Sequence, residues 1–309
     1  MNPARVFVAR LGLILNRRTL SARRRPSAIR FAGRTFMNDT LFRDRKSLVG
    51  MVHVEALPGT PRSQRSIREI ARGAAEQARM LEDCGFDAVM IENMHDRPYV
   101  NGPHDPQIIA SMAAVACSVR EAVKLPIGVQ ILSRGEREAI SVALAAGCQF
   151  IRCENFVFAH VADEGLLADA AAGPLLRFRR FIGADHIRIF CDIKKKHASH
   201  AITSDISISD AAHAAEFFGA DGVIVTGQFT GSPTDPGDVE KVRGSTGLPV
   251  LVGSGVTADQ VAVLFRHADA LIVGSAIKHG GVWSNPVDPQ RAAMLVRAAR
   301  SATDGPTGR

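Results

Sequence analysis

Eight short runs of apolar and β-branched residues recur along the chain, separated by segments long enough for one helix each. Their apolar residues are nearly continuous, which is typical of strands that are buried on both faces. Such strands pair in parallel and need a crossover helix between neighbours. The eight runs are Ser47–Val54, Phe86–Asn93, Leu125–Leu132, Gln149–Asn155, His186–Lys194, Asp221–Gly227, Leu248–Gly255 and Ala270–Ala276.

The segments between the runs carry signals for helix starts. Ser66 is followed three residues later by Glu69, and Thr257 by Gln260, so both pairs fit a capping box. Pro106 suits a first helical turn. With 46% hydrophobic residues in 309, the chain can bury a large core. Eight strand and helix units predict a single-domain (β/α)8 TIM barrel, an α/β fold. A doubly wound open sheet is the alternative.

The first 36 residues differ from the rest. They contain nine arginines and no lysine, aspartate or glutamate, a composition typical of a mitochondrial or plastid transit peptide. The alternative is that Met37 is the true start and that 1–36 is an upstream stretch outside the protein. The first reading places the protein in the mitochondrial matrix or plastid, and the second in the cytoplasm. We expect a disordered leader over 1–36, the barrel over 37–302 and a flexible tail over 303–309.

Charge and composition argue against several classes of function. The leader arginines exceed the net charge of +7, so the remainder is mildly acidic, and the chain has one Trp and one Tyr. Without a basic stripe interleaved with aromatic residues, we expect no nucleic-acid partner. No stretch reaches the roughly 18 to 20 apolar residues of a membrane-spanning helix. The five cysteines show no CxxC spacing, which indicates buried thiols instead of disulfides or a zinc site.

The last two predicted strands both end in a glycine and serine pattern. Gly253, Ser254 and Gly255 end the seventh run, and Gly274 with Ser275 interrupt the eighth. In TIM barrels the loops after strands seven and eight commonly bind phosphate, because glycines let backbone N–H groups approach the anion. The pattern predicts a phosphate site. The alternative is that these glycines only form tight turns.

Charged residues stand at the carboxyl ends of two central strands, where TIM barrels hold their catalytic groups. Counting by twos places Asp192 and Lys194 on one face of the fifth run, and Arg152 and Glu154 on one face of the fourth. We expect Asp192 and Lys194 to lie together at the barrel mouth.

His53 and Glu92 lie at the carboxyl ends of the first two predicted strands. We expect Asp192 to stay ionised beside the Lys194 ammonium, whereas Glu92, in a drier setting across the mouth, holds its proton to higher pH. This separation suits an acid and base pair. The alternative is that these charged residues are ion-pair partners that orient loops. The catalytic candidates are Glu92, Asp192, Lys194, His53 and Glu154.

Mixed nitrogen and oxygen ligands for a divalent metal could come from His53, Glu55, Asp192 and His197. No HxH or HExxH spacing is present, so we assign no metal residues and keep a divalent metal as an alternative.

Six motifs occur in a fixed order. They are "GMVHVEALPGTPRS" (Gly50–Ser63), "GFDAVMIENMHDRPY" (Gly85–Tyr99), "DIKKKHA" (Asp192–Ala198), "DGVIVTGQFTG" (Asp221–Gly231), "PVLVGSGVT" (Pro249–Thr257) and "NPVDP" (Asn285–Pro289). With these motifs in this order, the chain resembles the BtpA/SgcQ family over Ser47–Arg300.

This resemblance implies a barrel of the ribulose-phosphate-binding type. One cyanobacterial member of the family is associated with photosystem I biogenesis, and bacterial members occur in sugar-utilisation gene sets, but no settled reaction comes with the family. The positions that map onto family motifs are His53, Pro58, Gly59, Glu92, Asn93, Asp192, Lys196, His197, Gly227, Gly253–Gly255 and Gly274. Gly227 thereby joins the phosphate-site candidates.

Two departures from the family pattern affect the site. Glu55 stands where an apolar or neutral residue is expected, which argues against a shared role as a ligand. The segment "RCENFVFAHVADEG" (Arg152–Gly165) also differs from the family's usual segment, so Glu154 belongs to a subgroup.

Three functions compete at this point. The first is an isomerase, epimerase or lyase that transfers protons on a small phosphorylated metabolite derived from a sugar or nucleotide. The second is an assembly factor that keeps the barrel without turnover, and the third is a metal-dependent hydrolase. The expected partner is a phosphorylated small molecule, with self-association into a homo-oligomer as a further expectation.

Overall fold

The computed structural model describes residues 41–227 and 229–303, so the expected leader over 1–36 lies outside the described residues. The strands are β1 (Ser47–His53), β2 (Ala88–Glu92), β3 (Ile127–Gln130), β4 (Phe150–Cys153), β5 (His160–Ala162), β6 (Gly165–Leu167), β7 (Arg188–Asp192), β8 (Ala198–Ser199), β9 (Gly222–Val225), β10 (Val250–Val252) and β11 (Ala270–Val273). The α-helices are α1 (Ile67–Cys84), α2 (Pro106–Ala122), α3 (Glu136–Ala146), α4 (Ala172–Phe181), α5 (Ile208–Phe217), α6 (Pro236–Ser245), α7 (Val261–Leu264) and α8 (Pro289–Thr303). Short 3₁₀ helices cover η2 (Ala201–Thr203), η3 (Ser275–Ile277) and η4 (His279–Gly281).

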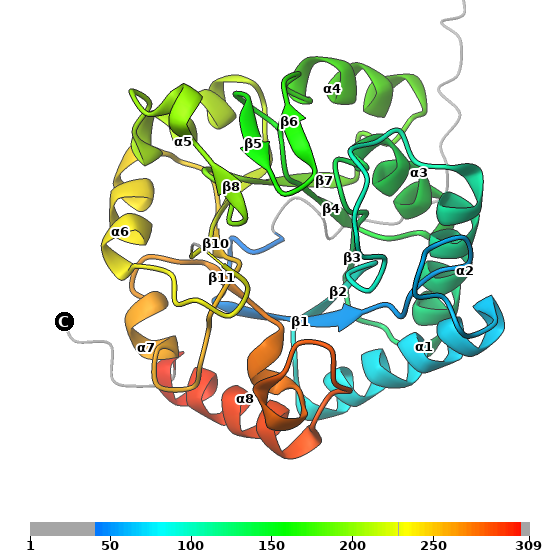
Figure 1. The fold of residues 1–309 in the computed structure, drawn as a ribbon. Coiled ribbons are helices and arrows are strands. Elements are labelled where there is room, and N and C mark those ends of the chain that lie inside the picture. The colour runs from blue at the N-terminus through cyan, green and yellow to red at the C-terminus, as the bar shows by residue number, and fades with distance from the viewer. Residues whose placement is uncertain (1–40, 228, 304–309) are drawn as a thin grey trace, which may run out of the picture. The chain divides into compact units, whose positions relative to one another are not determined.

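Eight of these strands close into a parallel barrel in the order β1-β11-β10-β9-β7-β4-β3-β2, with the helices arranged around it (Figure 1). Each barrel strand falls within one of the eight predicted runs. The (β/α)8 prediction is therefore confirmed and the open-sheet alternative is wrong. α8 ends at Thr303, one residue beyond the expected barrel boundary, and the rest of the expected tail lies outside the described residues.

The predicted helix starts have mixed outcomes. Ser66 and Glu69 form a complete capping box at the start of α1, and Pro106 is the first residue of α2. The prediction at Thr257 is wrong, because α7 begins only at Val261. The Thr257 hydroxyl instead donates to the Gln260 side chain across a turn, at 3.3 Å. None of the described helices is long and apolar enough to cross a membrane.

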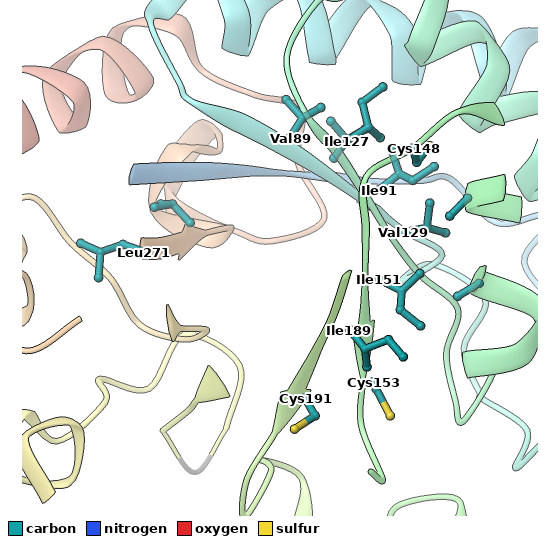
Figure 2. Close-up of a cluster of buried hydrophobic side chains, with 14 of the residues drawn as sticks. Val89, Ile91, Ile127, Val129, Cys148, Ile151, Cys153, Ile189, Cys191 and Leu271 are labelled. Carbon is teal, nitrogen blue, oxygen red and sulfur yellow. The ribbon is translucent and has the colours of Figure 1, made fainter. Parts of the chain in front are cut away.

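The main core lies between the strands and the surrounding helices. Figure 2 shows the outward-facing side chains of neighbouring strands, such as Val89, Ile127, Ile151 and Ile189, which form one buried layer. Cys153 and Cys191 belong to the same layer as free, buried thiols. Because both strand faces are covered, the near-continuous apolar runs are accounted for.

A second apolar cluster fills the interior of the barrel. Phe150 and Phe190 pack edge to face with their ring centres 5.6 Å apart, and Phe42 packs on both from the segment before β1. A Cβ atom at Gly128 would overlap the Phe150 ring, and one at Gly222 would overlap Phe190. These glycines make room for the rings, so the amino-terminal end of the barrel is packed with side chains.

A small antiparallel sheet, which the sequence patterns did not predict, follows β4 and β7. Its strands pair in the order β6-β5-β8, and Figure 1 shows it beside α4 and α5. The strands contain only two or three residues each, too few for an alternating pattern to be recognised. They place the segment that departs from the family pattern near the carboxyl ends of β4 and β7.

Candidate active site

Alternation along the barrel strands directs one inward residue per strand to the carboxyl-terminal end, which we call the mouth. Five are polar or charged and form what we call the charged arc: His53, Glu92, Gln130, Arg152 and Asp192. The other three are Thr226, Gly253 and Gly274, and the two glycines form what we call the glycine arc. Two adjoining cavities of about 210 and 270 Å³ open at the mouth and share Glu92, Arg152 and Lys196 in their walls.

Arg152 and Asp192 form an ion pair with two hydrogen bonds in the charged arc. Arg152 donates from Nε and from one terminal nitrogen to the two Asp192 carboxylate oxygens, both at 2.8 Å. Both side chains are almost fully buried. The charge of Asp192 is thus balanced by Arg152 across two neighbouring strands, and not by Lys194 as the counting by twos predicted.

Lys194 does not line either mouth cavity. β7 ends at Asp192, and Lys194 adopts a left-handed backbone with φ of 46°. Its ammonium donates to the Thr203 carbonyl oxygen at 3.1 Å. The prediction that Lys194 joins Asp192 at the mouth is wrong, because side chains alternate only while the backbone stays extended.

Glu154 lines the larger mouth cavity and is already paired. The Lys195 ammonium lies 3.0 Å from its Oε1, and the Arg134 backbone N–H donates to its Oε2 at 3.2 Å. Burial alone would raise the pKa of Glu154, but the Lys195 charge and these hydrogen bonds hold that pKa below its ordinary value. An ionised, paired carboxylate suits positioning better than proton transfer.

Glu92 and His53 form a different kind of pair. The Glu92 Oε2 atom lies 3.8 Å from His53 Nε2, and both side chains are buried. Burial raises the pKa of Glu92, although the nearby Arg152 and Lys196 charges oppose this shift. Burial, together with the Lys278 charge, lowers the pKa of His53 to about 3. At neutral pH the imidazole is therefore neutral.

A backbone carbonyl fixes the tautomer of His53. Its Nδ1 lies 2.8 Å from the Trp283 carbonyl oxygen. A carbonyl oxygen can only accept, so Nδ1 carries the proton and the Nε2 lone pair is directed at the site. Glu92, a carboxyl group with a raised pKa, and His53, a neutral nitrogen acceptor, can together act as a general acid and a general base.

The glycine arc borders the smaller mouth cavity together with Ser254, Gly255, Ser275 and Arg291. Within residues 41–227 and 229–303, the backbone N–H groups of Gly255, Ser275 and Ala276 donate to no other residue. Gly255 has a left-handed φ of 65° and is so close to Ser232 that a Cβ atom would overlap it. Free backbone donors in a glycine-lined cavity are typical of anion sites.

Two other predicted phosphate-site positions, Ser254 and Gly227, have clear local roles. The Ser254 hydroxyl lies 3.1 Å from the carbonyl oxygens of Phe229 and Ser232, so it secures the loop after β9. Gly227 lines neither mouth cavity, and a Cβ atom there would lie 2.5 Å from the Ser232 oxygen. Gly227 therefore serves close loop packing, in contrast to its predicted role at the phosphate.

Several residues of the site lie outside the ends of the barrel strands. Arg291, in the first turns of α8, donates from Nε to the Ala276 carbonyl oxygen at 2.8 Å while lining the smaller cavity. Trp283 lines the larger cavity, with the Arg97 guanidinium 4.5 Å above its ring. The only signal for Trp283 was that it is the single tryptophan of the chain.

Two family-motif residues tie loops around the mouth. Asn93 donates to Asp96 at 2.8 Å and accepts from the Leu132 backbone N–H at 2.7 Å. His197 Nε2 accepts from the Thr230 backbone N–H at 3.1 Å. Both side chains hold loop backbone in place.

The four residues considered as metal ligands do not come together. Asp192 is paired with Arg152, and Glu55 lies 3.1 Å from Arg65. Over the described part of the chain, no three His, Cys, Asp or Glu side chains form a group that could hold a metal ion.

A third cavity of about 360 Å³ also has His53 in its wall. Its wall includes Arg62, Arg65 and Arg97, with Glu55 as its one acidic residue. The three arginines make this cavity an alternative anion site to the glycine arc.

The BtpA family profile matches residues 44–301. An uncharacterized protein of Caenorhabditis elegans named as mitochondrial is 42% identical over 269 residues, which cover 85% of this chain and 96% of that protein. An uncharacterized protein of Pyrococcus furiosus is 35% identical, covering 83% and 96%. The photosystem I biogenesis protein BtpA of Synechocystis is 29% identical, covering 83% and 89%. The chain therefore belongs to the BtpA family.

Solved structures add support for the fold alone. A thiamine phosphate pyrophosphorylase from Pyrococcus furiosus superimposes with a TM-score of 0.53 at 13% identity, covering 85% of this chain and 98% of that one. N-(5'-phosphoribosyl)anthranilate isomerase from the same organism gives 0.50 at 14% identity, covering 82% and 99%. Similarity at this level says nothing about the reaction.

Proposed function

We propose that this BtpA-family protein is an enzyme that moves protons on a small phosphorylated metabolite, with the phosphate group held by the glycine arc. The observation that carries the proposal is the distance between the two arcs. A Cβ atom added to Gly274 would lie 3.3 Å from His53 Cε1, so an anion held beside Gly274 and Ser275 brings the molecule that bears it next to His53 and Glu92.

In the proposed reaction Glu92 is the acid and His53 Nε2 the acceptor. Burial keeps the proton on Glu92 to a higher pH than usual, so it can protonate an oxygen of the bound molecule. The neutral imidazole can take a proton from a neighbouring carbon. Isomerase, epimerase and lyase reactions all require such a transfer.

The burial of these groups also supports turnover over a purely structural role. Removing the Glu92 carboxyl and the His53 imidazole from water costs free energy, and a non-catalytic scaffold gains no function in return. The competing proposal is a non-catalytic assembly factor, in line with the name of the Synechocystis relative. The two proposals differ in whether a bound phosphorylated ligand is converted.

The test is a screen of phosphorylated metabolites by thermal shift, followed by product analysis of every compound that raises the melting temperature. For a true substrate, Glu92→Gln should lower kcat about 100-fold or more and leave the thermal shift in place. Glu55→Gln is the matched control, because that carboxylate is 41% exposed and paired with Arg65 outside the mouth. Stabilising ligands that are never converted by the unaltered protein would favour the assembly factor.

A further inference from the structure

Three consecutive lysines follow β7, and the structure gives each a different environment. Lys194 donates to the Thr203 carbonyl oxygen, outside the mouth cavities. Lys195 forms an ion pair with Glu154 at 3.0 Å. Lys196 lines both mouth cavities, and no described residue lies within hydrogen-bonding distance of its ammonium. Only Lys196 therefore presents an unpaired amine to the site.

The backbone holds Lys196 in this position. Its N–H donates to the Thr226 hydroxyl at 3.0 Å, which joins the loop to the end of β9. Lys194 and His197 on either side have left-handed backbones, with φ of 46° and 55°. The chain thus turns twice within four residues and places the Lys196 side chain between the charged arc and the glycine arc.

The surroundings of Lys196 make its ammonium easier to deprotonate than that of an exposed lysine. Burial lowers its pKa below the ordinary value, and the Arg152 guanidinium adds to this effect, while Glu92 and Asp192 oppose it. A neutral amine has the free electron pair that a nucleophile needs, whereas an ammonium has none. A lysine that serves only as a phosphate-binding cation would gain nothing from such an environment.

We propose that Lys196 is a nucleophile that forms a Schiff base with the carbonyl group of a phosphorylated aldehyde or ketone. This inference rests on the proposed function and narrows its substrate class. It places the carbonyl carbon of the substrate at Lys196 and the phosphate at the glycine arc, and both groups line the smaller mouth cavity.

The atoms of the step balance without a further reactant. The Nζ electron pair attacks the carbonyl carbon, and a proton passes from nitrogen to oxygen, which gives a carbinolamine. Protonated Glu92 then donates its proton to the hydroxyl group, the C–O bond breaks and water leaves. The products are an iminium ion on Lys196, one water molecule and the Glu92 carboxylate. That carboxylate, or His53 Nε2, can next take a proton from the carbon beside the iminium ion.

Reductive trapping tests the inference. The full-length protein is incubated with dihydroxyacetone phosphate or glycolaldehyde phosphate, sodium borohydride is added, and peptides are analysed by mass spectrometry. We expect a reduced adduct on Lys196 at least about 10-fold more abundant than on Lys194 or Lys195, which serve as internal controls in the same peptide. The adduct should reach half its maximum at a lower pH than adducts on exposed lysines.

Lys196→Arg separates the nucleophile from a simple cation. The variant keeps a positive charge but lacks a nucleophilic amine, so it should lose the adduct and still be stabilised by inorganic phosphate. Failure of both probes to modify Lys196, or equal modification of all three lysines, contradicts the inference. If phosphate still stabilises the unaltered protein in that case, the proposed function stands; if phosphate has no effect either, both fail.

Discussion

The two arcs of the barrel mouth differ in which part of the chain faces the cavity: side chains in the charged arc and backbone in the glycine arc. In the charged arc, side chains are removed from water and balanced against one another, as Arg152 and Asp192 are at 2.8 Å. In the glycine arc, side chains are absent and the backbone itself faces the cavity. A backbone donor cannot be titrated, so it suits a constant anchor. Buried side chains can gain or lose protons, which suits chemistry.

The largest expected effect tests whether the charged arc depends on pairing. Asp192→Asn removes the charge of the carboxylate that Arg152 contacts through two hydrogen bonds, so it should lower the free energy of unfolding by about 3–5 kcal/mol. Urea unfolding measures this. Glu55→Gln removes one partner of an exposed pair and should cost less than about 1 kcal/mol. Equal losses in the two variants would show that burial of the Arg152–Asp192 pair does not matter.

The next prediction concerns Lys278, which follows the eighth barrel strand, β11, and is fully buried, with its ammonium 3.1 Å from the Gln77 side chain. Burial lowers the pKa of Lys278 to about 7 from an ordinary value of 10.5. Between these pH values the unfolded chain holds a proton that the folded chain has lost, so stability rises with pH across this window.

Lys278→Met should therefore raise the free energy of unfolding by about 4 kcal/mol at pH 6, and the gain should shrink as the pH approaches 10. Urea unfolding at a series of pH values measures it. Lys124→Met, at an exposed lysine, should show no such trend. A gain in Lys278→Met that is the same at every pH would mean that packing, and not charge, is responsible.

Glu136 gives the opposite pH dependence. It begins α3, its Oε1 has no hydrogen-bond partner in the described part of the chain, and burial raises its pKa from 4.5 to about 7. Between pH 4.5 and 7 the folded chain holds the extra proton, so stability falls as pH rises through this window.

Glu136→Gln should be more stable than the unaltered protein by roughly 3 kcal/mol at pH 8 and nearly equal to it at pH 4.5. Exposed Glu121 provides the control substitution Glu121→Gln. A stabilisation at pH 4.5 as large as that at pH 8 would refute the assigned titration.

The smallest expected effect tests phosphate binding at the glycine arc. Gly274→Ala adds a Cβ atom 3.3 Å from His53 Cε1, which crowds the cavity with little cost to the fold. We expect at least about a 10-fold weaker affinity for inorganic phosphate, or roughly 1.4 kcal/mol, by calorimetry. Gly244→Ala, where a Cβ atom meets nothing within 4 Å, is the control. Gly253→Ala is a poorer test, because its Cβ would lie 2.7 Å from Ile224.

The sequence indicated the glycines of the glycine arc more completely than the contacts of the charged arc. Gly253, Gly255 and Gly274 were found because a glycine that ends a strand is a local signal. Glu92 and His53 were recognised because they lie at strand ends. Their contact with each other was not predicted, because it depends on how β1 and β2 align in the barrel. Lys194 was placed wrongly because its left-handed backbone ends the alternation.

Arg152 and Asp192 were recognised at strand ends, but their ion pair was not, because it joins residues 40 positions apart. Arg291 carried no signal, because it lies on a helix and not at a strand end. Both features follow from barrel closure, which the pattern of a single strand does not reveal.

The most direct test of the account is a crystal structure of the protein with bound inorganic phosphate. We predict phosphate density in the smaller mouth cavity, with its oxygens within hydrogen-bonding distance of the backbone N–H groups of Gly255 and Ser275 and of the Arg291 guanidinium. Phosphate bound only beside Arg62, Arg65 and Arg97 in the third cavity would contradict the assignment of the glycine arc as the phosphate site.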